Sequence, residues 1–238
     1  MESMETTRTT PLELSELRGR LVSHAGFGPA LKALENGGAA AFDRVWGSGC
    51  ALLASALAGA RQEAGGGTLL VVTSGADRLD ELVEDLNLFL GGPRNRTAAF
   101  PAWENEDARG RPLHDEIYAR RMRLLKRLAW NQPPAVVATN IQSLLQPIPT
   151  AEQLRGSTRL LRNGDTIDPE ELARWLTEHG YVSTPAVELP GEFALRGGLL
   201  DVFAPDWERP ARIEFFDDEI DSLRHFDPAS QRSSEKLT

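Results

Sequence analysis

The chain has 238 residues, 41% of them hydrophobic and 26% charged, a composition that is ordinary for a globular protein of one large or two modest domains. Its formal net charge of −9 excludes a generally basic nucleic-acid-binding surface, so we expect protein partners. The single cysteine excludes an internal disulfide, and no apolar run reaches the roughly 18 residues of a membrane-spanning helix. We therefore expect a cytoplasmic protein, and the four scattered histidines predict no metal site.

The first strongly patterned stretch is a glycine turn, Gly47-Ser48-Gly49, after helical turns over 11–35. We interpret residues 39–46 as a buried strand before the turn and residues 51–62 as a helix after it. A strand, a glycine turn and a helix in this order are typical of a phosphate-binding loop.

The residues that give such a loop its chemistry are missing. On the pattern G-x-x-x-x-G-K-[ST], the first glycine is replaced by Arg44, the lysine by Cys50 and the hydroxyl residue by Ala51, whereas the last glycine is present as Gly49. Without an ammonium group for the phosphates and a hydroxyl group for Mg²⁺, nucleotide hydrolysis lacks its charged contacts. We therefore predict a degenerate, non-functional nucleotide loop made of Arg44, Gly47, Gly49, Cys50 and Ala51, with no catalytic residue and no cofactor.

Strands and helices alternate in the rest of the first half. Apolar strands are predicted over 68–73, 97–100 and 135–139, and helices over 77–90 and 141–146. The run 68–73 is continuously apolar, which is typical of a strand covered on both faces. The alternation favours a parallel α/β sheet of the RecA type.

A basic segment over 113–130 is predicted to be a helix, with apolar residues on one side and Arg120, Arg121, Arg123, Lys126 and Arg127 on the other. Two interpretations stay open. The basic side contacts an acidic partner or nucleic acid, or it is a solvated face balanced by Asp115, Glu116 and acidic residues elsewhere in the chain, and we favour the second.

The prolines of Pro147-Ile148-Pro149 predict a linker, so we divide the chain into domains 1–150 and 151–238. After it we predict a short strand over 158–162 and a helix with Asp168 as N-cap, Pro169 at its first position and Gly180 as its stop. The apolar face of this helix should pack on a small sheet.

That sheet is an antiparallel meander with strands predicted over 192–196, 199–203, 211–216 and 219–226. The period of two puts Arg196, Arg212 and Phe216 on one polar face, opposite an apolar face. An arginine–aromatic surface favours docking of a protein, but the pattern also fits solvated arginines with Phe216 covering a core edge. The acidic residues Asp217, Asp218, Glu219 and Asp221 fit a solvated turn better than a Mg²⁺ site or an acid/base pair.

Several motifs of this meander closely resemble the second domain of the transcription-repair coupling factor family and, less closely, the matching domain of UvrB. They are Gly191-Glu192-Phe193, Arg196-Gly197, Leu200-Asp201-Val202-Phe203 and the run from Phe215 to Arg224. In the first half, Gly47-Ser48-Gly49 and the segment from Phe100 to Glu104 resemble the same families. Arg44, Cys50 and Ala51 depart from UvrB as the first domain of the coupling factor does.

The resemblance implies an N-terminal fragment with a degenerate RecA-like or P-loop-like parallel sheet domain, followed by a small α+β domain. It implies an adaptor that recruits UvrA to stalled RNA polymerase in transcription-coupled nucleotide excision repair, with Arg196, Arg212 and Phe216 as the UvrA-binding residues. ATP, Mg²⁺, DNA and RNA polymerase would then be bound by other domains of a parent DNA translocase. The alternative is an ATP-binding fragment of a UvrB-like helicase.

Overall fold

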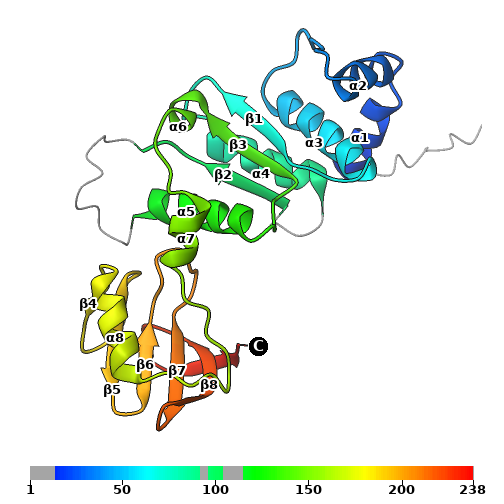
Figure 1. The fold of residues 1–238 in the computed structure, drawn as a ribbon. Coiled ribbons are helices and arrows are strands. Elements are labelled where there is room, and N and C mark those ends of the chain that lie inside the picture. Colours follow the sequence, from blue (N-terminus) through cyan, green and yellow to red (C-terminus); the bar gives the residue numbers. More distant parts are fainter. Residues whose placement is uncertain (1–13, 92–95, 104–114, 238) are drawn as a thin grey trace, which may run out of the picture. The chain divides into compact units, whose positions relative to one another are not determined.

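The computed structural model describes residues 14–91, 96–103 and 115–237 (Figure 1). Contacts divide this part of the chain into two units. The first holds the described residues up to Phe100 together with Pro133–Leu144, and the second holds those of Pro101–Gln132 and the chain from Leu145 on. The predicted domain boundary near residue 150 stays a prediction. Within the described ranges, no helix is long and apolar enough to cross a membrane.

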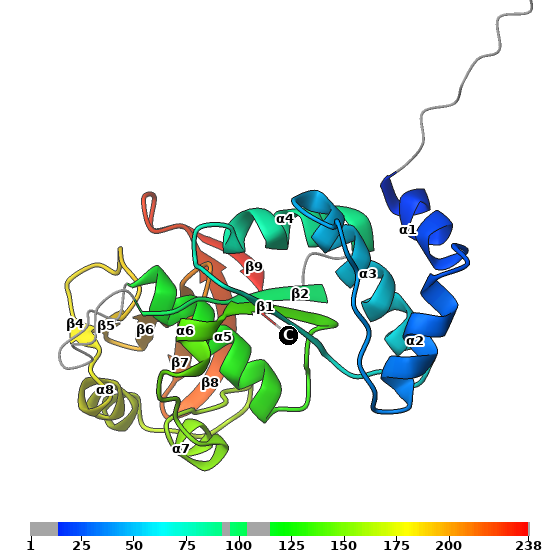
Figure 2. The ribbon, with the colours of Figure 1, turned by 90° about the horizontal axis from the view of Figure 1, so that it is seen from above.

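The first unit is built on a parallel sheet of β1 (Leu69–Thr73), β3 (Val136–Asn140) and β2 (Thr97–Phe100), in that order. The central strand β3 is buried along its whole length. Its helices are α1 (Leu14–Val22), α2 (Phe27–Glu35), α3 (Ser48–Glu63), α4 (Leu79–Leu90) and α6 (Ile141–Leu144). Figure 2 shows α3 and α4 on one side of the sheet.

The core of this unit lies between those two helices and the sheet. Small side chains of α3, Ala54 and Ala58, meet Leu86 and Phe89 of α4 and the central strand residue Val136. Because alanines fill the α3 side of this contact, the helix backbone approaches its neighbours closely.

Two predictions for this unit are wrong. Residues 39–46, predicted to be a buried strand, form an irregular segment that is exposed from Asp43 to Gly47, because no neighbouring strand pairs with it. Strand β1 is not covered on both faces, because Leu70 and Val72 are 51% and 45% exposed. As an edge strand, β1 packs through alternate side chains against the core formed with α3 and α4.

The second unit contains α5 (Glu116–Ala129), α7 (Ala151–Gly156) and α8 (Pro169–Glu178). Each begins at a side chain that accepts a backbone hydrogen bond, namely Asp115, Thr150 and Asp168. The cap of α8 confirms its predicted start. Helix α7 was not predicted, and the predicted strand over 158–162 is irregular, because this segment has no sheet partner.

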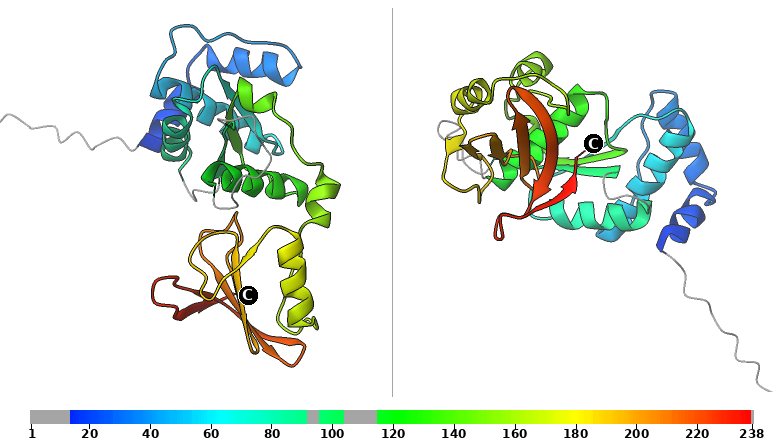
Figure 3. Two further views of the ribbon diagram at one scale, coloured as in Figure 1. Left: turned by 90° about the vertical axis from the view of Figure 1, so that its left-hand side faces the viewer. Right: turned by 90° about the horizontal axis from the view of Figure 1, so that it is seen from below.

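The second sheet has the order β4 (Val182–Ser183), β5 (Glu192–Arg196), β6 (Leu199–Val202), β7 (Ala211–Phe216), β8 (Glu219–Phe226) and β9 (Ser233–Lys236). Strand β4 is parallel to β5 and the other pairs are antiparallel. Helix α8 runs along one side of this sheet (Figure 3), where Leu172 and Leu176 pack on Phe193, Leu200 and Ile213. The predicted fold class, a parallel α/β sheet followed by a small α+β part with a meander, is confirmed.

The alternation predicted that the opposite face of this sheet is polar. The structure shows that part of this face is apolar and buried. Val187, Ala194, Phe203 and Phe226 form a second, smaller buried cluster there. Val187 and Phe203 lie outside the strands, in loop segments that fold over part of this face.

The basic residues of α5 are used inside the second unit. Arg121 is 1% exposed, donates from Nη1 to the carbonyl oxygen of Pro101 at 2.7 Å, and lies over the ring of Trp103. Arg123 Nε donates to the carbonyl oxygen of Asp206 at 2.8 Å, and Lys126 Nζ lies 2.8 Å from its carboxylate. The interpretation of this side as a solvated face is therefore wrong for Arg121, which is buried. Arg123 and Lys126 are partly exposed, and Lys126 is balanced by an acidic residue elsewhere in the chain.

The environment of the two tyrosines of the chain, Tyr118 and Tyr181, predicts an alkaline titration. Burial raises the pKa of both phenols, and the negative charge of Asp206 raises them further. Because both folded pKa values lie above the unfolded value of about 10, the stability that they contribute is complete below that pH. It is lost as the pH rises above about 10 toward the folded pKa values.

We expect the ultraviolet absorbance of phenolate to rise only above pH 10 in the folded protein, together with a falling free energy of unfolding. Asp206→Asn should lower both tyrosine pKa values, whereas Glu235→Gln, at an exposed carboxylate, should leave them unchanged. Tyrosines that ionise at their ordinary pKa in the folded chain contradict this account.

Candidate functional site

The structure places Arg196, Arg212 and Phe216 on the face of the second sheet that lies away from α8. Their strand neighbours Leu195, Ile213 and Phe215 belong to the core that packs against α8. Successive side chains of a strand point to opposite faces, so the three predicted residues point the other way. Leu199 lies directly opposite both Arg196 and Glu214 in the register, and it joins them on this face. We call Arg196, Leu199, Arg212, Glu214 and Phe216 the docking face.

Phe216 lies at the tip of the β7–β8 hairpin and is 75% exposed. The tip is anchored by backbone hydrogen bonds from Phe215 to Gly198 at 2.8 Å, from Ile167 to Asp218 at 2.7 Å and from Ile220 to Asp165 at 2.9 Å. The interpretation in which Phe216 covers a core edge is therefore wrong, because its ring is open to solvent on a fixed backbone.

Asp201 of β6 lies between the two arginines and binds both. Its carboxylate is 2.7 Å from Arg212 Nε and 2.9 Å from Arg196 Nη2, and its side chain is 1% exposed. Asp201 was not among the site residues predicted from the sequence. The register could have found it, since Asp201 is directly opposite Arg212 and therefore on the same face.

The two arginines differ in how much they offer to a partner. The side chain of Arg212 is 14% exposed, donates two hydrogen bonds to Asp201 and one to the carbonyl oxygen of Gln231, and lies over Phe226. Its hydrogen bonds to Asp201 raise the pKa of Arg212. The side chain of Arg196 is 52% exposed and has one bond to Asp201, so about half of it is open to solvent.

Leu199 extends the apolar part of the docking face beside Phe216. It is 38% exposed, and its cross-strand neighbour Glu214 accepts a hydrogen bond from Ser222 at 2.7 Å. An exposed aromatic ring, an exposed leucine and a guanidinium held by a buried carboxylate fit a protein partner that has an apolar pocket and nearby carboxylates.

The residues of the degenerate nucleotide loop lie together at the start of α3. Arg44 and Gly47 both have left-handed backbone conformations, with φ angles of 60° and 56°. Gly49 follows in the first turn of the helix. Cys50 is exposed and its Sγ lies 3.6 Å from the carbonyl oxygen of Val45, whereas Ala51 is fully buried in the core. A hydroxyl group at position 51 would therefore face the core.

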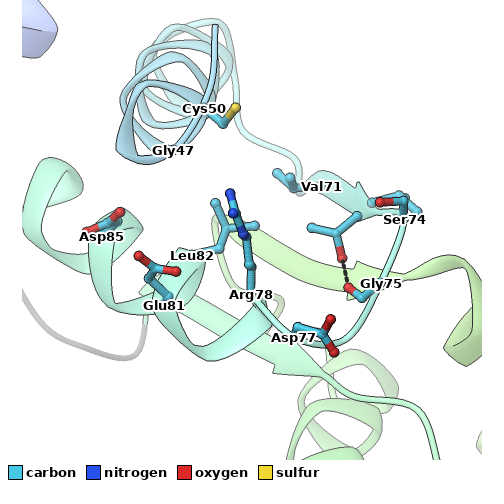
Figure 4. Close-up of a pocket in the computed structure, with 12 residues that line it drawn as sticks. Gly47, Cys50, Val71, Ser74, Gly75, Asp77, Arg78, Glu81, Leu82 and Asp85 are labelled. Atoms are coloured by element: carbon cyan, nitrogen blue, oxygen red, sulfur yellow. Dashed lines mark hydrogen bonds between the residues drawn. The ribbon is translucent and has the colours of Figure 1, made fainter.

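A pocket of about 560 Å³ lies beside this loop, between Gly47, Cys50, β1 and the start of α4 (Figure 4). Its charged lining consists of the carboxylates of Asp77, Glu81 and Asp85 and the guanidinium of Arg78. Negative charge therefore dominates where a nucleotide would place its phosphates, so the residues present do not fit a triphosphate. In the described part of the chain, no three His, Cys, Asp or Glu side chains are grouped to hold a metal ion.

The shared carboxylate of Asp201 predicts a large loss of stability when its charge is removed. Asp201→Asn leaves two guanidiniums without their counter-ion, and breaking a buried pair in this way costs about 3 kcal/mol. The free energy of unfolding in urea measures this loss. Glu235→Gln removes a carboxylate from the exposed pair with Arg209 and should cost less than about 1 kcal/mol. Equal losses in the two variants contradict the central role of Asp201.

A protein family and several known proteins match this chain in sequence. The family described as the UvrB interaction domain matches residues 160–238. The chain is 35% identical over 162 residues to the transcription-repair-coupling factor of Bacillus subtilis, a match that covers 68% of this chain and 13% of that protein. For the protein of the same name in Mycobacterium bovis, the identity is 40% over 190 residues, covering 76% and 14%. For that of Escherichia coli it is 36% over 124 residues, covering 52% and 11%.

The chain thus spans less than one sixth of the length of these curated relatives. The family match lies over the meander motifs, and the matches to the relatives, over 162 and 190 residues, extend into the first half of the chain. The chain carries the UvrB-homology region of the transcription-repair-coupling factor family.

Proposed function

We propose that this chain is a non-catalytic docking module that binds UvrA through the docking face of its second sheet. Through this contact it recruits UvrA to RNA polymerase stalled at DNA damage, in transcription-coupled nucleotide excision repair. The observation that carries the proposal is Phe216, which is 75% exposed on an anchored hairpin beside the Arg196–Asp201 pair. The matched family and the relatives agree with a role in repair.

The energy of such a contact comes mainly from burying the aromatic ring. Moving an exposed phenylalanine side chain into an apolar pocket contributes roughly 1.5–3 kcal/mol. Arg196 adds charge-assisted hydrogen bonds to carboxylates or carbonyl groups of UvrA. Asp201 holds its guanidinium in place before binding, so less side-chain entropy is lost on association.

Arg212 has a different part in this proposal. Its bonds to Asp201 and Gln231 leave little of the side chain for a partner, so it acts mainly by fixing Asp201, which in turn fixes Arg196. Replacing Arg212 therefore weakens both the fold and the binding surface, and replacing Arg196 also affects both, because it too is bonded to Asp201. Phe216 is the residue whose replacement tests binding apart from stability.

The remaining activities of a coupling factor belong, in this proposal, to chain outside this region. ATP and Mg²⁺, DNA and RNA polymerase are bound by other domains of a parent translocase, and the location of the protein is the cytoplasm. The contacts of Arg121, Arg123 and Lys126 within the second unit support this division, because three of the five basic side chains of α5 are engaged inside the unit.

Calorimetric titration with purified UvrA tests the docking face. Phe216→Ala should weaken binding by about 2 kcal/mol, or roughly 30-fold, since it truncates a central aromatic anchor. Arg196→Ala should weaken it by about 1 kcal/mol. Phe216→Ala should unfold at the wild-type urea concentration, because its ring is largely exposed. Arg196→Ala removes one of the two partners of the buried Asp201 carboxylate and should lower the urea midpoint, so its loss of binding is compared at urea-free conditions where the variant is folded.

Val182→Ala is the matched control, since Val182 is a 61% exposed apolar residue of the same sheet, on the outer strand β4. It should bind UvrA as the wild type does. Wild-type affinity in both the Phe216 and Arg196 variants contradicts the assignment of this face.

The proposal also requires that the degenerate loop binds no nucleotide. A ligand with a dissociation constant of about 10 μM, added at about 1 mM, stabilises the folded state by about 2.7 kcal/mol. We expect ATP with Mg²⁺ to leave the thermal unfolding midpoint unchanged, because carboxylates dominate the pocket beside α3. A rise of several degrees would favour the ATP-binding fragment of a UvrB-like helicase instead.

A further inference from the structure

Two more cations continue the docking face across the second sheet. Arg224 of β8 lies directly opposite Arg212 of β7, and Lys236 of β9 lies directly opposite Arg224. Directly opposite residues of antiparallel strands point to the same face of the sheet. Arg212, Arg224 and Lys236 therefore form a row of three positive side chains on neighbouring strands.

Two carboxylates lie beside this row on the same face, and neither is paired with Arg224 or Lys236. Asp201 is bonded to Arg196 and Arg212, and Glu214, two residues from Arg212 on β7, accepts a hydrogen bond from Ser222. Within the described ranges, neither Arg224 nor Lys236 has a carboxylate at ion-pair distance. Glu235, next to Lys236 in sequence, pairs with Arg209 at 3.3 Å. Like charges directly opposite each other destabilise a sheet, so this arrangement costs free energy in the unbound protein.

The side chain of Arg224 is only partly accessible. Its Nε is buried and has no hydrogen-bond acceptor in the described part of the chain. Because water does not reach this atom, a protein partner does not reach it either, so a contact with a partner would use the terminal Nη groups of the guanidinium.

We propose that Arg224 and Lys236 form a second contact zone of the docking face, which binds carboxylates on the same protein partner. This inference rests on the proposed function and names the chemistry that the partner must bring. Arg212 stands four residues before Phe216 on β7, which is roughly 13 Å along a strand. The partner therefore presents an apolar pocket for Phe216 and an acidic patch about that distance away.

Charges at the rim of an interface act mainly on the association rate and on its dependence on salt. Arg224→Gln and Lys236→Gln, singly and together, test the zone in the whole chain by stopped-flow association with purified UvrA at low and high ionic strength. The double variant should associate roughly 3-fold to 10-fold more slowly at low salt, and its rate should depend less on salt than that of the wild type. Removing the like charge opposite Arg212 should leave the urea midpoint of Arg224→Gln at or above that of the wild type.

Arg174→Gln is the matched control for net charge. Arg174 is an exposed residue of α8, the helix that packs on the other face of the sheet. Its replacement makes the same change in net charge as either single variant and should leave the association rate unchanged. An equal slowing in this control overturns the inference, because it means that the partner responds to the net charge of the whole chain and not to the positions of Arg224 and Lys236.

The possible results separate the inference from the function on which it rests. Wild-type association by the double variant, together with loss of binding in Phe216→Ala, overturns the second zone and leaves the proposed function standing. Wild-type binding in both overturns the proposed function as well. If Arg224→Gln unfolds, the Lys236→Gln variant alone tests the inference, because Lys236 is exposed on β9 and its replacement should not affect folding. An association rate and a salt dependence that are unchanged in Lys236→Gln then overturn the inference.

Discussion

The carboxylate of Asp201, buried between the guanidiniums of Arg196 and Arg212, is the interaction on which the second sheet depends. It joins three neighbouring strands by side-chain bonds in addition to their backbone ladder. A buried carboxylate is stable only with full compensation, and the two arginines supply it. The same bonds fix the direction of Arg196, so the contact that stabilises the fold also prepares its surface for a partner.

The helices and strands that were predicted correctly are those for which several local sequence signals favour the structure that the tertiary contacts also require. The meander and α8 were found because alternation, turn residues and the cap at Asp168 all favour the same structure. The short strands β4 and β9 were missed, because two residues give no alternation and Ser233–Lys236 is entirely polar. The segment 39–46 was predicted wrongly, because an apolar run forms a strand only where another strand pairs with it.

The candidate site was predictable in part for a similar reason. The shared face of Arg196, Arg212 and Phe216 follows from a period of two, and the structure places them there. The buried state of Arg212 does not follow from that period, since it depends on Asp201, on Gln231 and on the ring of Phe226, which lie on other strands and loops. Burial of Arg121 likewise depends on Pro101 and Trp103, which are distant in sequence.

Strand β9 ends the second sheet on one side, and its composition bears on self-association. An outer strand has unpaired backbone groups to which another molecule can add, and charged side chains discourage such addition. The strand Ser233–Lys236 carries a glutamate and a lysine, and all of its residues are exposed. The sheet can thus leave an aromatic ring uncovered on its face and still resist the addition of another molecule at β9.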